Sequence, residues 1–497
     1  MPRVSALARA EQLAAEEAGQ HLYANRVRVY PKAVHGPVRR FKWAVLIVCL
    51  SIYYALPWLR WHRGPGRPDQ ALLLSIADRR FYFFDLVLWP QDIFYLTGLL
   101  ILCAVGLFLV TSLMGRVWCG YTCPQTVWTD LFMWVERLIE GDRTERMRRD
   151  AKPMSLNSAW RKTLKHSLWV VIAFWTGGAW ITYFVDAPTL VTSFWTGTAS
   201  SAVYGFIALF TASTYLLAGW AREQVCTFMC PWPRFQAAMF DEQSFIVTYQ
   251  AWRGEPRGHV KSEAKGDCID CGACVTACPT GIDIRDGVQL ECIGCGLCID
   301  ACNEIMTRTE RPLWLITWDN LARQTAKTAA KTLGIQNAKP PPIRLLRPRT
   351  IIYATAMVLA ATVMSVALAT RATISLSVQQ DRAPLFVRLA DGSVRNGFTV
   401  KIVNKTQMDA VFDLDMHGLG EDVMALAESH TAQATSLVLP VPADEVGSFR
   451  VLVTAFVHGE QHPVDFVLHD RATGQTVAAH ALFQGPGRIE RHDNHDH

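Results

Sequence analysis

Cys268-Ile-Asp-Cys271-Gly-Ala-Cys274-Val-Thr-Ala-Cys278 and Cys292-Ile-Gly-Cys295-Gly-Leu-Cys298-Ile-Asp-Ala-Cys302 are two runs with the same cysteine spacing. Each run reads C-x-x-C-x-x-C-x-x-x-C, the spacing of bacterial ferredoxins that hold two [4Fe–4S] clusters. In such pairs the fourth cysteine of each run binds the cluster of the other run. The spacing predicts two ligand sets: Cys268, Cys271, Cys274 and Cys302 for one cluster, and Cys292, Cys295, Cys298 and Cys278 for the other.

The residues between these cysteines support the same interpretation. Three thiolates reach one small cluster only if the backbone curls tightly, and Gly272, Gly294 and Gly296 supply the freedom for that curl. Zinc is the main alternative, because paired C-x-x-C motifs also bind Zn²⁺. The doubled pattern of eight cysteines favours iron–sulfur clusters. Asn303 follows Cys302, whereas a proline follows Cys278, so the two runs differ locally at this point.

The composition indicates a multi-domain membrane protein. The chain has 497 residues, is 50% hydrophobic and 19% charged, and has a formal net charge of +5. Soluble proteins average about 25% charged residues, and a chain this apolar is not disordered. A diffuse charge of +5 does not indicate nucleic-acid binding. No C-x-x-C-H, G-x-G-x-x-G or Walker A motif occurs, which argues against c-type haem, nicotinamide cofactors and ATP.

Five apolar stretches approach the length of about 20 residues that crosses a bilayer. They run approximately over Phe41–Leu59, Ile93–Met114, His166–Val185, Ser193–Trp220 and Thr350–Thr370. A sixth candidate, Leu72–Pro90, contains four charged residues and is interpreted as a re-entrant or interfacial segment.

The distribution of Lys and Arg predicts the orientation. Residues 1–40 carry seven basic and three acidic residues, residues 137–165 carry nine and four, and residues 320–349 carry seven and none. These segments are expected in the cytoplasm. With five crossings, the carboxyl terminus lies outside. Residues 1–40 show no convincing cleavage site, so they are expected to remain attached to the first helix.

Two further cysteine pairs have the form C-x-x-x-C-P: Cys119-Gly-Tyr-Thr-Cys123-Pro and Cys226-Thr-Phe-Met-Cys230-Pro. Each pair follows an apolar stretch that ends on the cytoplasmic side, so both are expected at one depth, facing the cluster domain. Thiolates are soft ligands that select Cu(I), and a dithiol can also cycle through a disulfide. The pairs are predicted to bind copper. Met229 is a weaker candidate ligand, and Cys49 and Cys103 are interpreted as packing residues.

From Ala372 onward, seven or eight short alternating segments are separated by turn signals such as Asp391-Gly392 and Asn396-Gly397. This pattern predicts an immunoglobulin-like sandwich without its disulfide. The tail carries His492, His495 and His497, which are more simply interpreted as part of a solvated terminus than as a copper site.

The predicted fold is therefore a polytopic α-helical membrane domain of about five helices with an inserted ferredoxin-like double [4Fe–4S] domain and a C-terminal immunoglobulin-like β-sandwich. The expected regions are a cytoplasmic segment (1–40), a membrane domain with four helices and both C-x-x-x-C-P pairs (41–240), the double-cluster domain with a basic linker (241–349), a fifth helix (350–371) and the exterior domain with its tail (372–497).

Several motifs together resemble the FixG/RdxA/CcoG family of cytochrome oxidase accessory proteins. They are Cys119-Gly-Tyr-Thr-Cys123-Pro124-Gln125, the segment from Cys226 to Pro233, the double-cluster block, Arg253-Gly-Glu-Pro-Arg257-Gly258, and Pro384-Leu-Phe386 followed by Asp391-Gly392. The resemblance extends from about Tyr30 to about Phe483 and includes the order of the domains.

This resemblance implies a reductase that converts Cu(II) to Cu(I) for the maturation of a cbb-type haem–copper oxidase. It implies that the cluster cysteines carry electrons and that Cys119, Cys123, Cys226 and Cys230 handle copper. It also implies a Gram-negative inner membrane, with the clusters in the cytoplasm and the terminal domain in the periplasm. The expected partners are copper ions, membrane lipid, a cytoplasmic electron donor and a copper chaperone or oxidase subunit. A second copy of the chain, in a homodimer, is a further candidate partner.

Two other functions remain as alternatives. One is a quinol-oxidising membrane ferredoxin, a class that shares C-x-x-x-C-P and double clusters but whose members lack the exterior sandwich. The other is a non-enzymatic copper scaffold or redox sensor with structural clusters. The basic stretch from Arg323 to Arg349 could seat a flavodoxin-like donor, but attraction to anionic lipid explains it more simply.

Overall fold

The computed structural model describes residues 28–64, 67–258, 266–335, 339–420, 422–427 and 434–486. The chain divides into two compact units, residues 1–362 and 363–497. Most of the expected cytoplasmic amino-terminal segment and the three histidines of the tail lie outside the described residues.

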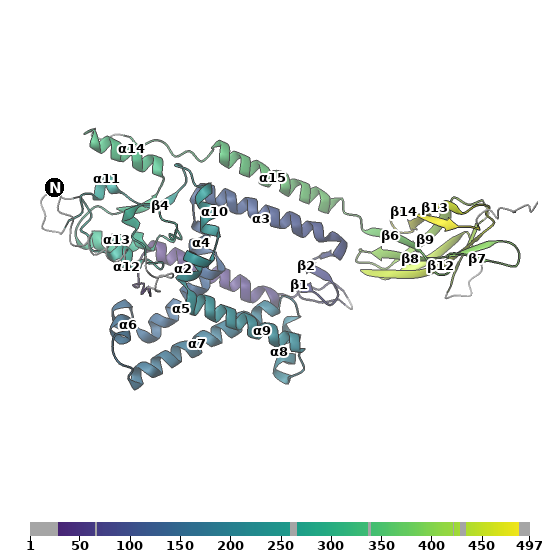
Figure 1. Ribbon diagram of the computed structural model, residues 1–497, viewed down its shortest axis with the longest axis horizontal. Helices are drawn as coiled ribbons and strands as arrows, with labels where there is room; N and C mark the ends of the chain where they lie inside the picture. The colour runs from purple at the N-terminus through teal and green to yellow at the C-terminus, as the bar shows by residue number, and fades with distance from the viewer. Residues whose placement is uncertain are drawn as a thin grey trace, which may run out of the picture. The chain divides into compact units, whose positions relative to one another are not determined.

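Four helices in the described part of the chain are long and apolar enough to cross a membrane: Pro37–Trp58, Pro90–Met114, Ser201–Ala221 and Pro348–Ala369. They contain the helices α2 (Pro37–Ala55), α3 (Ile93–Met114), α9 (Ser201–Thr214) and α15 (Pro348–Ala369) (Figure 1). Short 3-10 turns, η1 (Leu56–Trp58) and η2 (Pro90–Asp92), extend the first two of them.

The expected span at 166–185 lies in the longer helix α7 (Leu156–Ile181), which is not among those four. Its first turns carry Arg161, Lys162 and Lys165, which interrupt the apolar sequence. The helix nevertheless packs closely along α9: Ile181, at its end, clusters with Ile207, in the first half of α9. A Cβ on Gly177 would lie 2.8 Å from the backbone nitrogen of Thr211. The two helices therefore form an antiparallel pair.

One other apolar stretch differs from expectation, and the predicted re-entrant or interfacial segment forms a small sheet. The stretch from Ser193 to Trp220 is not one helix, because α8 (Ala187–Thr196) ends at Gly197, whose φ of 77° is left-handed. Residues 72–88 form a three-stranded antiparallel sheet of β1 (Leu72–Ser75), β2 (Arg80–Phe83) and β3 (Leu86–Leu88). The Arg63 guanidinium donates to the carbonyls of Gln70 and Ala71, both at 2.8 Å, and so holds the chain that enters this sheet.

The helices between α3 and α7 are short and partly buried: α4 (Val117–Tyr121), α5 (Pro124–Glu140) and α6 (Arg143–Asp150). Two π-helical segments, η3 (Tyr215–Ala221) and η4 (Val225–Met229), follow α9, and α10 (Trp232–Met239) comes next. Such π segments occur frequently at functional sites.

The cluster domain is small and built around two short helices, α12 (Ala273–Ala277) and α13 (Leu297–Arg308), which pack on each other. A two-stranded sheet of β4 (Ile246–Tyr249) and β5 (Ile316–Asp319) covers their apolar side. The remaining elements are α11 (Ala251–Gly254), η5 (Ile284–Asp286) and α14 (Leu321–Thr332).

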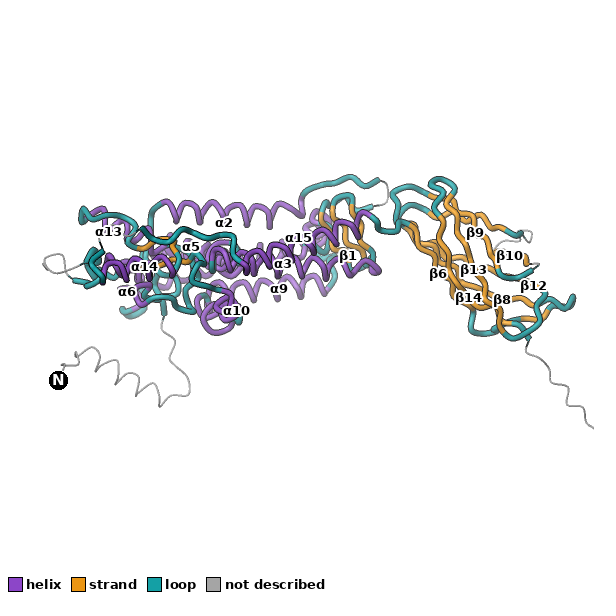
Figure 2. The backbone as a smooth tube through the Cα atoms, turned by 90° about the horizontal axis from the view of Figure 1, so that it is seen from above, coloured by secondary structure: helices purple, strands orange, loops and turns teal. Residues whose placement is uncertain are grey.

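The terminal unit is a two-sheet sandwich, as predicted, and its strands are orange in Figure 2. One sheet has the order β10-β12-β8-β6 with β7 added to β8, and the other has the order β11-β9-β13-β14. Phe398, Phe412, Phe466 and Phe483 are fully buried between the sheets. The strands are β6 (Ile374–Gln380), β7 (Val387–Arg388), β8 (Val394–Asn404), β9 (Ala410–His417), β10 (Asp422–Leu426), β11 (Ser436–Val441), β12 (Glu445–Ala455), β13 (Gln461–Asp470) and β14 (Thr476–Gln484).

The turn predicted at Asn396-Gly397 is wrong, because both residues lie inside β8. Asn396 is 1% exposed, and its side chain donates to the carbonyl of Gln484 and accepts from the amide of Gln484, at 2.8 and 2.9 Å. At Gly397 a Cβ would overlap the Asp381 carboxylate, which would then have to shift. The residues that signalled a turn instead join the two sheets.

Candidate metal centres

The second predicted ligand set lines one cavity. Cys278, Cys292, Cys295 and Cys298 surround it together with Cys274 of the first set and apolar side chains such as Ile293. Burial, followed by the neighbouring thiolates Cys295, Cys292 and Cys278, raises the pKa of Cys298 well above its ordinary value. We refer to the four cysteines of the second set as cradle 2.

The first predicted ligand set is also brought together. Burial and the charges of Cys274, Cys271 and Cys268 raise the pKa of the Cys302 thiol to about 12. Cys302 thus faces the first run although it belongs to the second, as the spacing predicts. Cys268, Cys271, Cys274 and Cys302 form cradle 1, in which Cys271 is exposed and the other three are buried.

Left-handed backbone positions shape both cradles. Gly272 and Gly296 precede α12 and α13 with φ of 64° and 71°, and Gly294 has φ of 66°. In the first run Asp270 occupies the position of Gly294 and also has a positive φ of 54°. Asp tolerates this conformation better than most residues. The Arg285 guanidinium donates to the Asp270 carboxylate at 2.5 Å, which holds that turn.

The chemistry of the two cradles suits iron–sulfur clusters. Buried thiols with raised pKa values are costly to ionise unless cations lie among them. Within the described residues, no three His, Cys, Asp or Glu side chains are grouped closely enough to hold one metal ion, neither in the cradles nor among Cys119, Cys123, Cys226 and Cys230. Zn²⁺ needs four ligands at about 2.0–2.3 Å from one centre. The cysteine spacing of the two runs, each completed by the fourth cysteine of the other, is what favours two cubanes over zinc ions.

The two C-x-x-x-C-P motifs meet beside cradle 2. Cys119 lies in α4 and Cys226 in η4, and both pack against the apolar cluster of Ile293, Cys295 and Leu297. Burial, followed by Cys123, Cys119 and Cys230, raises the pKa of Cys226 to about 12. We call Cys119, Cys123, Cys226 and Cys230 the four-thiol site.

The first motif lies directly on the loop of cradle 2. A Cβ on Gly120 would lie 2.9 Å from the carbonyl oxygen of Ile293 and 3.0 Å from the backbone nitrogen of Cys295. The neighbouring Tyr121 hydroxyl donates to the carbonyl oxygen of Cys295 at 3.1 Å, and this bond is buried. Only glycine at position 120 permits this approach. The four-thiol site and cradle 2 therefore share a wall.

Arg116 joins three chain segments at this wall. Its guanidinium Nη1 donates to the carbonyl oxygen of Cys292 at 3.0 Å and also to that of Leu290. Its Nη2 donates to the carbonyl oxygen of Pro233, just after the second motif, at 3.1 Å. One buried side chain thus holds the end of α3, the loop of cradle 2 and the second motif together.

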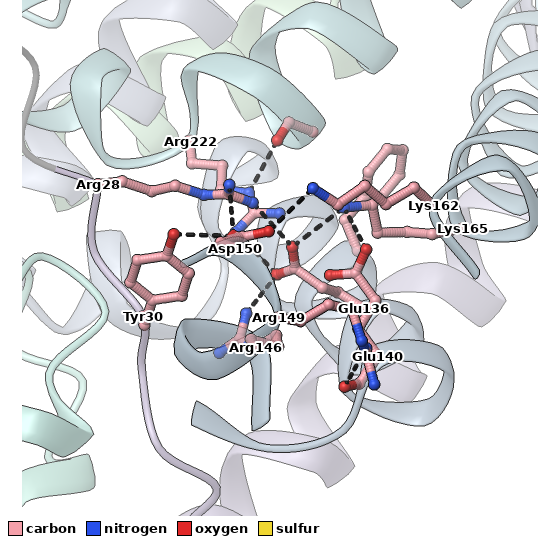
Figure 3. A network of polar contacts seen from close by, with 12 residues as sticks. Arg28, Tyr30, Glu136, Glu140, Arg146, Arg149, Asp150, Lys162, Lys165 and Arg222 are labelled. Carbon is pink, nitrogen blue, oxygen red and sulfur yellow. Dashed lines mark hydrogen bonds and ion pairs between the residues drawn. The ribbon is translucent and has the colours of Figure 1, made fainter. Parts of the chain in front are cut away.

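A buried ionic network holds the chain that leads into the second motif (Figure 3). Arg222, with φ of 45°, lies between η3 and η4, and its Nη1 is 2.9 Å from the Glu136 carboxylate. Arg146 and Lys165 contact the same carboxylate at 2.6 and 3.6 Å. Burial opposes ionisation of Glu136, but Arg222, Arg146 and Lys165 outweigh it and lower the pKa of Glu136 to about 2. The charge pairs stabilise the strained backbone at Arg222.

Asp300 connects α13 to the first membrane helix. Its carboxylate accepts from the backbone nitrogens of Arg39 at 2.7 Å and Val38 at 3.3 Å, which caps the start of α2. A Cβ on Gly36 would overlap this carboxylate at 2.3 Å. Arg116, Arg222 and Asp300 were missed from the sequence, because their partners are far away in the chain and no spacing connects them.

The other sulfur-containing residues singled out from the sequence are Cys49, Cys103 and Met229. Cys49 is half-buried in α2 and Cys103 is exposed on α3. Met229 is 63% exposed at the end of η4, and its role as a ligand stays a prediction.

Comparison with known families matches three segments. Residues 221–321 match a 4Fe-4S dicluster domain, residues 96–140 match a 4Fe-4S binding domain, and residues 364–486 match the IG-like fold at the C-terminus of FixG. The first match contains both cradles, and the second contains Cys119 and Cys123.

Three relatives are similar over nearly the whole chain. The nitrogen fixation protein FixG of Rhizobium meliloti is 44% identical over 95% of this chain and 95% of its own. Protein RdxB of Cereibacter sphaeroides is 44% identical over 94% and 98%, and protein RdxA of the same organism is 46% identical over 87% and 90%. With its apolar helices, its two cysteine cradles and its terminal sandwich, this chain belongs to the FixG/RdxA/RdxB family of membrane iron–sulfur proteins.

Proposed function

We propose that this membrane iron–sulfur oxidoreductase reduces Cu(II) to Cu(I) at the four-thiol site. The observation that carries the proposal is the convergence of Cys119 and Cys226, from motifs far apart in the chain, on the wall that contains Cys295. A site for a soft metal thus adjoins a site suited to an iron–sulfur cluster.

The four thiols favour reduction through their ligand preference. Cu(I) is softer than Cu(II), so thiolates bind the product more strongly than the substrate. Bound iron–sulfur clusters would supply the electrons one at a time, and each Cu(II) ion accepts one electron to become Cu(I). Ile293 and Leu297 are buried and pack against Cys119 and Cys226, so the contact between the two sites has apolar surroundings.

A wider role is part of the same proposal and rests on the resemblance of the motifs to the FixG/RdxA/CcoG family. We propose that the Cu(I) is delivered for assembly of a cbb-type haem–copper oxidase in a bacterial inner membrane. In this arrangement the cradles lie on the cytoplasmic side and the sandwich lies in the periplasm. Two ion pairs support this topology. Lys165, near the start of α7, and Arg222, after α9 and η3, both contact Glu136. The pair of helices α7 and α9 therefore begins and ends on the same side, the side of the cradles. Five crossings then separate the two termini.

A second candidate for the four-thiol site has a specific observation in its favour. The match of residues 96–140 to a 4Fe-4S binding domain includes Cys119 and Cys123. The four thiols could therefore hold a further cluster instead of copper. Iron analysis separates the two: the cradles alone account for about eight iron atoms per chain, and a third cluster would bring the total to about twelve.

The test of the proposed function is the double variant Cys119→Ser/Cys226→Ser. Anaerobic protein with reduced clusters is mixed with Cu(II), and Cu(I) is trapped with a chromogenic chelator. We expect the variant to retain its iron and to lose most of the rate of Cu(I) formation. The matched control is Cys103→Ser, an exposed cysteine on α3 that should not change the rate. An unchanged rate of Cu(I) formation in the double variant would show that copper is not reduced at the four-thiol site.

A further inference from the structure

A cavity of about 340 Å³ lies among the helices of the membrane bundle, beside the first motif. Its walls come from α2, α5, α7, α9 and η3, of which α2, α5, α7 and α9 are labelled in Figure 1. Pro124, in its lining, directly follows Cys123 of the four-thiol site. The cavity has the size of a small-molecule site, for which about 300–1,000 Å³ is typical.

The lining combines flat apolar rings with a few polar groups. Trp128, Trp180 and Phe210 contribute the rings, and Gln125 and Thr214 contribute polar side chains. An enclosure of aromatic faces with few polar groups is typical of sites for ring-shaped organic ligands.

Two polar groups of the lining, the Gln125 carbonyl oxygen and the Thr214 hydroxyl, are free to form hydrogen bonds with a ligand. The Gln125 amide nitrogen donates to the carbonyl oxygens of Leu217 at 2.8 Å and Arg222 at 3.1 Å, which fixes the amide. Its carbonyl oxygen and the Thr214 hydroxyl have no hydrogen-bond partner among the described residues. Thr214 belongs to the membrane-crossing segment Ser201–Ala221, where an unpaired polar group is costly. These two groups indicate a ligand that carries oxygen atoms.

The lining also excludes other occupants. It contains no Cys, Met or His, the residues that would guide copper. A lipid acyl chain would fill the volume but would leave Gln125 and Thr214 unpaired. An aromatic ring that carries hydroxyl groups and enters from the lipid phase can pack on the aromatic side chains and form hydrogen bonds with both polar groups.

We propose that this cavity binds the ring of a lipid-soluble quinol, which gives the oxidoreductase an electron entry from the membrane in addition to any donor in the cytoplasm. The inference rests on the proposed copper reduction for its overall reaction. One quinol loses two electrons and two protons to become a quinone. The two electrons reduce two Cu(II) ions to Cu(I), and the two protons pass to water.

Binding is tested first with duroquinone, a ring without an isoprenoid tail whose carbonyl oxygens can accept from the Thr214 hydroxyl, titrated calorimetrically into the full-length protein in detergent. We expect saturable binding to one site per chain. Thr214→Val removes one hydrogen bond and keeps the side-chain volume, so we expect a Kd about three- to tenfold higher. The matched control is Thr192→Val, on α8 outside the cavity, whose hydroxyl bonds only within its own helix. Its Kd should equal that of the unmodified chain.

Electron entry is tested separately. Under anaerobic conditions and without copper, duroquinol should bleach the visible absorption of the clusters, and Thr214→Val should require more duroquinol for the same bleaching. Absence of saturable duroquinone binding, or equal Kd values for both variants, would overturn the inference. Copper reduction driven by dithionite tests the proposed function without quinol, so either can fail while the other stands.

Discussion

At the scale of single residues, the account depends on one close backbone approach. A Cβ atom added at Gly120 would lie 2.9–3.0 Å from backbone atoms of Ile293 and Cys295, which leaves no room for a methyl group. The sequence places this glycine inside a C-x-x-x-C-P motif but gives no reason for it. The reason is a contact with a loop that follows much later in the chain.

Gly120→Ala should therefore push the first motif away from cradle 2. We expect the free energy of unfolding to fall by about 1–3 kcal/mol, as for other overpacked sites, and Cu(I) formation to slow. Gly205→Ala is the control, because a Cβ there meets nothing within 4 Å in the middle of α9. Thermal unfolding and the chelator assay measure both variants. If Gly120→Ala behaves like Gly205→Ala, the shared wall does not matter.

The same scale shows what the cysteine spacing could predict. Both ligand sets follow from the spacing alone, and the structure brings together Cys302 with the first run and Cys278 with the second. Local chain geometry is enough for this. The clamp by Arg116 could not be predicted, since its partners are backbone carbonyls, which leave no trace in the sequence.

At the scale of elements, the π segments η3 and η4 bring the second motif to its position. Arg222 lies between them in a backbone conformation that few residues adopt, and Glu136 on α5 holds it. The network in Figure 3 thus positions Cys226 without touching it.

This network predicts a pH dependence. The pKa of Glu136 is lowered in the folded chain to about 2 from 4.5, so its contribution to stability is complete above about pH 4.5 and is lost as the pH falls toward 2. Glu136→Gln should destabilise the chain by about 3–5 kcal/mol at pH 7, because buried cations lose their partner. The difference between variant and unmodified chain should shrink below pH 4.5. Circular dichroism of both proteins at matched pH measures it.

The control for that experiment is Glu304→Gln, which removes an exposed pair with Arg308. Exposed pairs contribute about 0–1 kcal/mol, so little change is expected. A constant difference between Glu136→Gln and the unmodified chain down to pH 2 would contradict the role assigned to Glu136.

Helix and strand boundaries were harder to predict than the cysteine ligands, because the same sequence pattern can occur in two kinds of structure. The apolar stretch from Ser193 to Trp220 conceals a turn at Gly197, because hydropathy averages over it. The charges of residues 72–88 indicated a re-entrant or interfacial segment but did not indicate that the segment forms strands. Asn396-Gly397 is a strong turn signal, yet packing between the sheets of the sandwich overrides it.

At the scale of the whole molecule, the proposed topology separates the cradles from the sandwich by the membrane. No cysteine follows Cys302, so a cysteine placed in the sandwich is a clean reporter. Ala472→Cys, exposed in the hairpin before β14, should react with an impermeant maleimide in intact spheroplasts. Ala329→Cys, exposed on α14, should react only after permeabilisation. Labelling of both cysteines in intact spheroplasts would contradict five crossings.

If electrons held at the cradles reduce copper at the adjoining thiols, a single-turnover titration will detect the transfer. Protein is purified anaerobically, its clusters are reduced with dithionite, excess dithionite is removed, and Cu(II) is added while the cluster and Cu(II) signals are followed by electron paramagnetic resonance. We predict that both cluster signals disappear as about two Cu(II) ions per chain become Cu(I), one for each cluster. Clusters that remain reduced beside an undiminished Cu(II) signal would contradict the account.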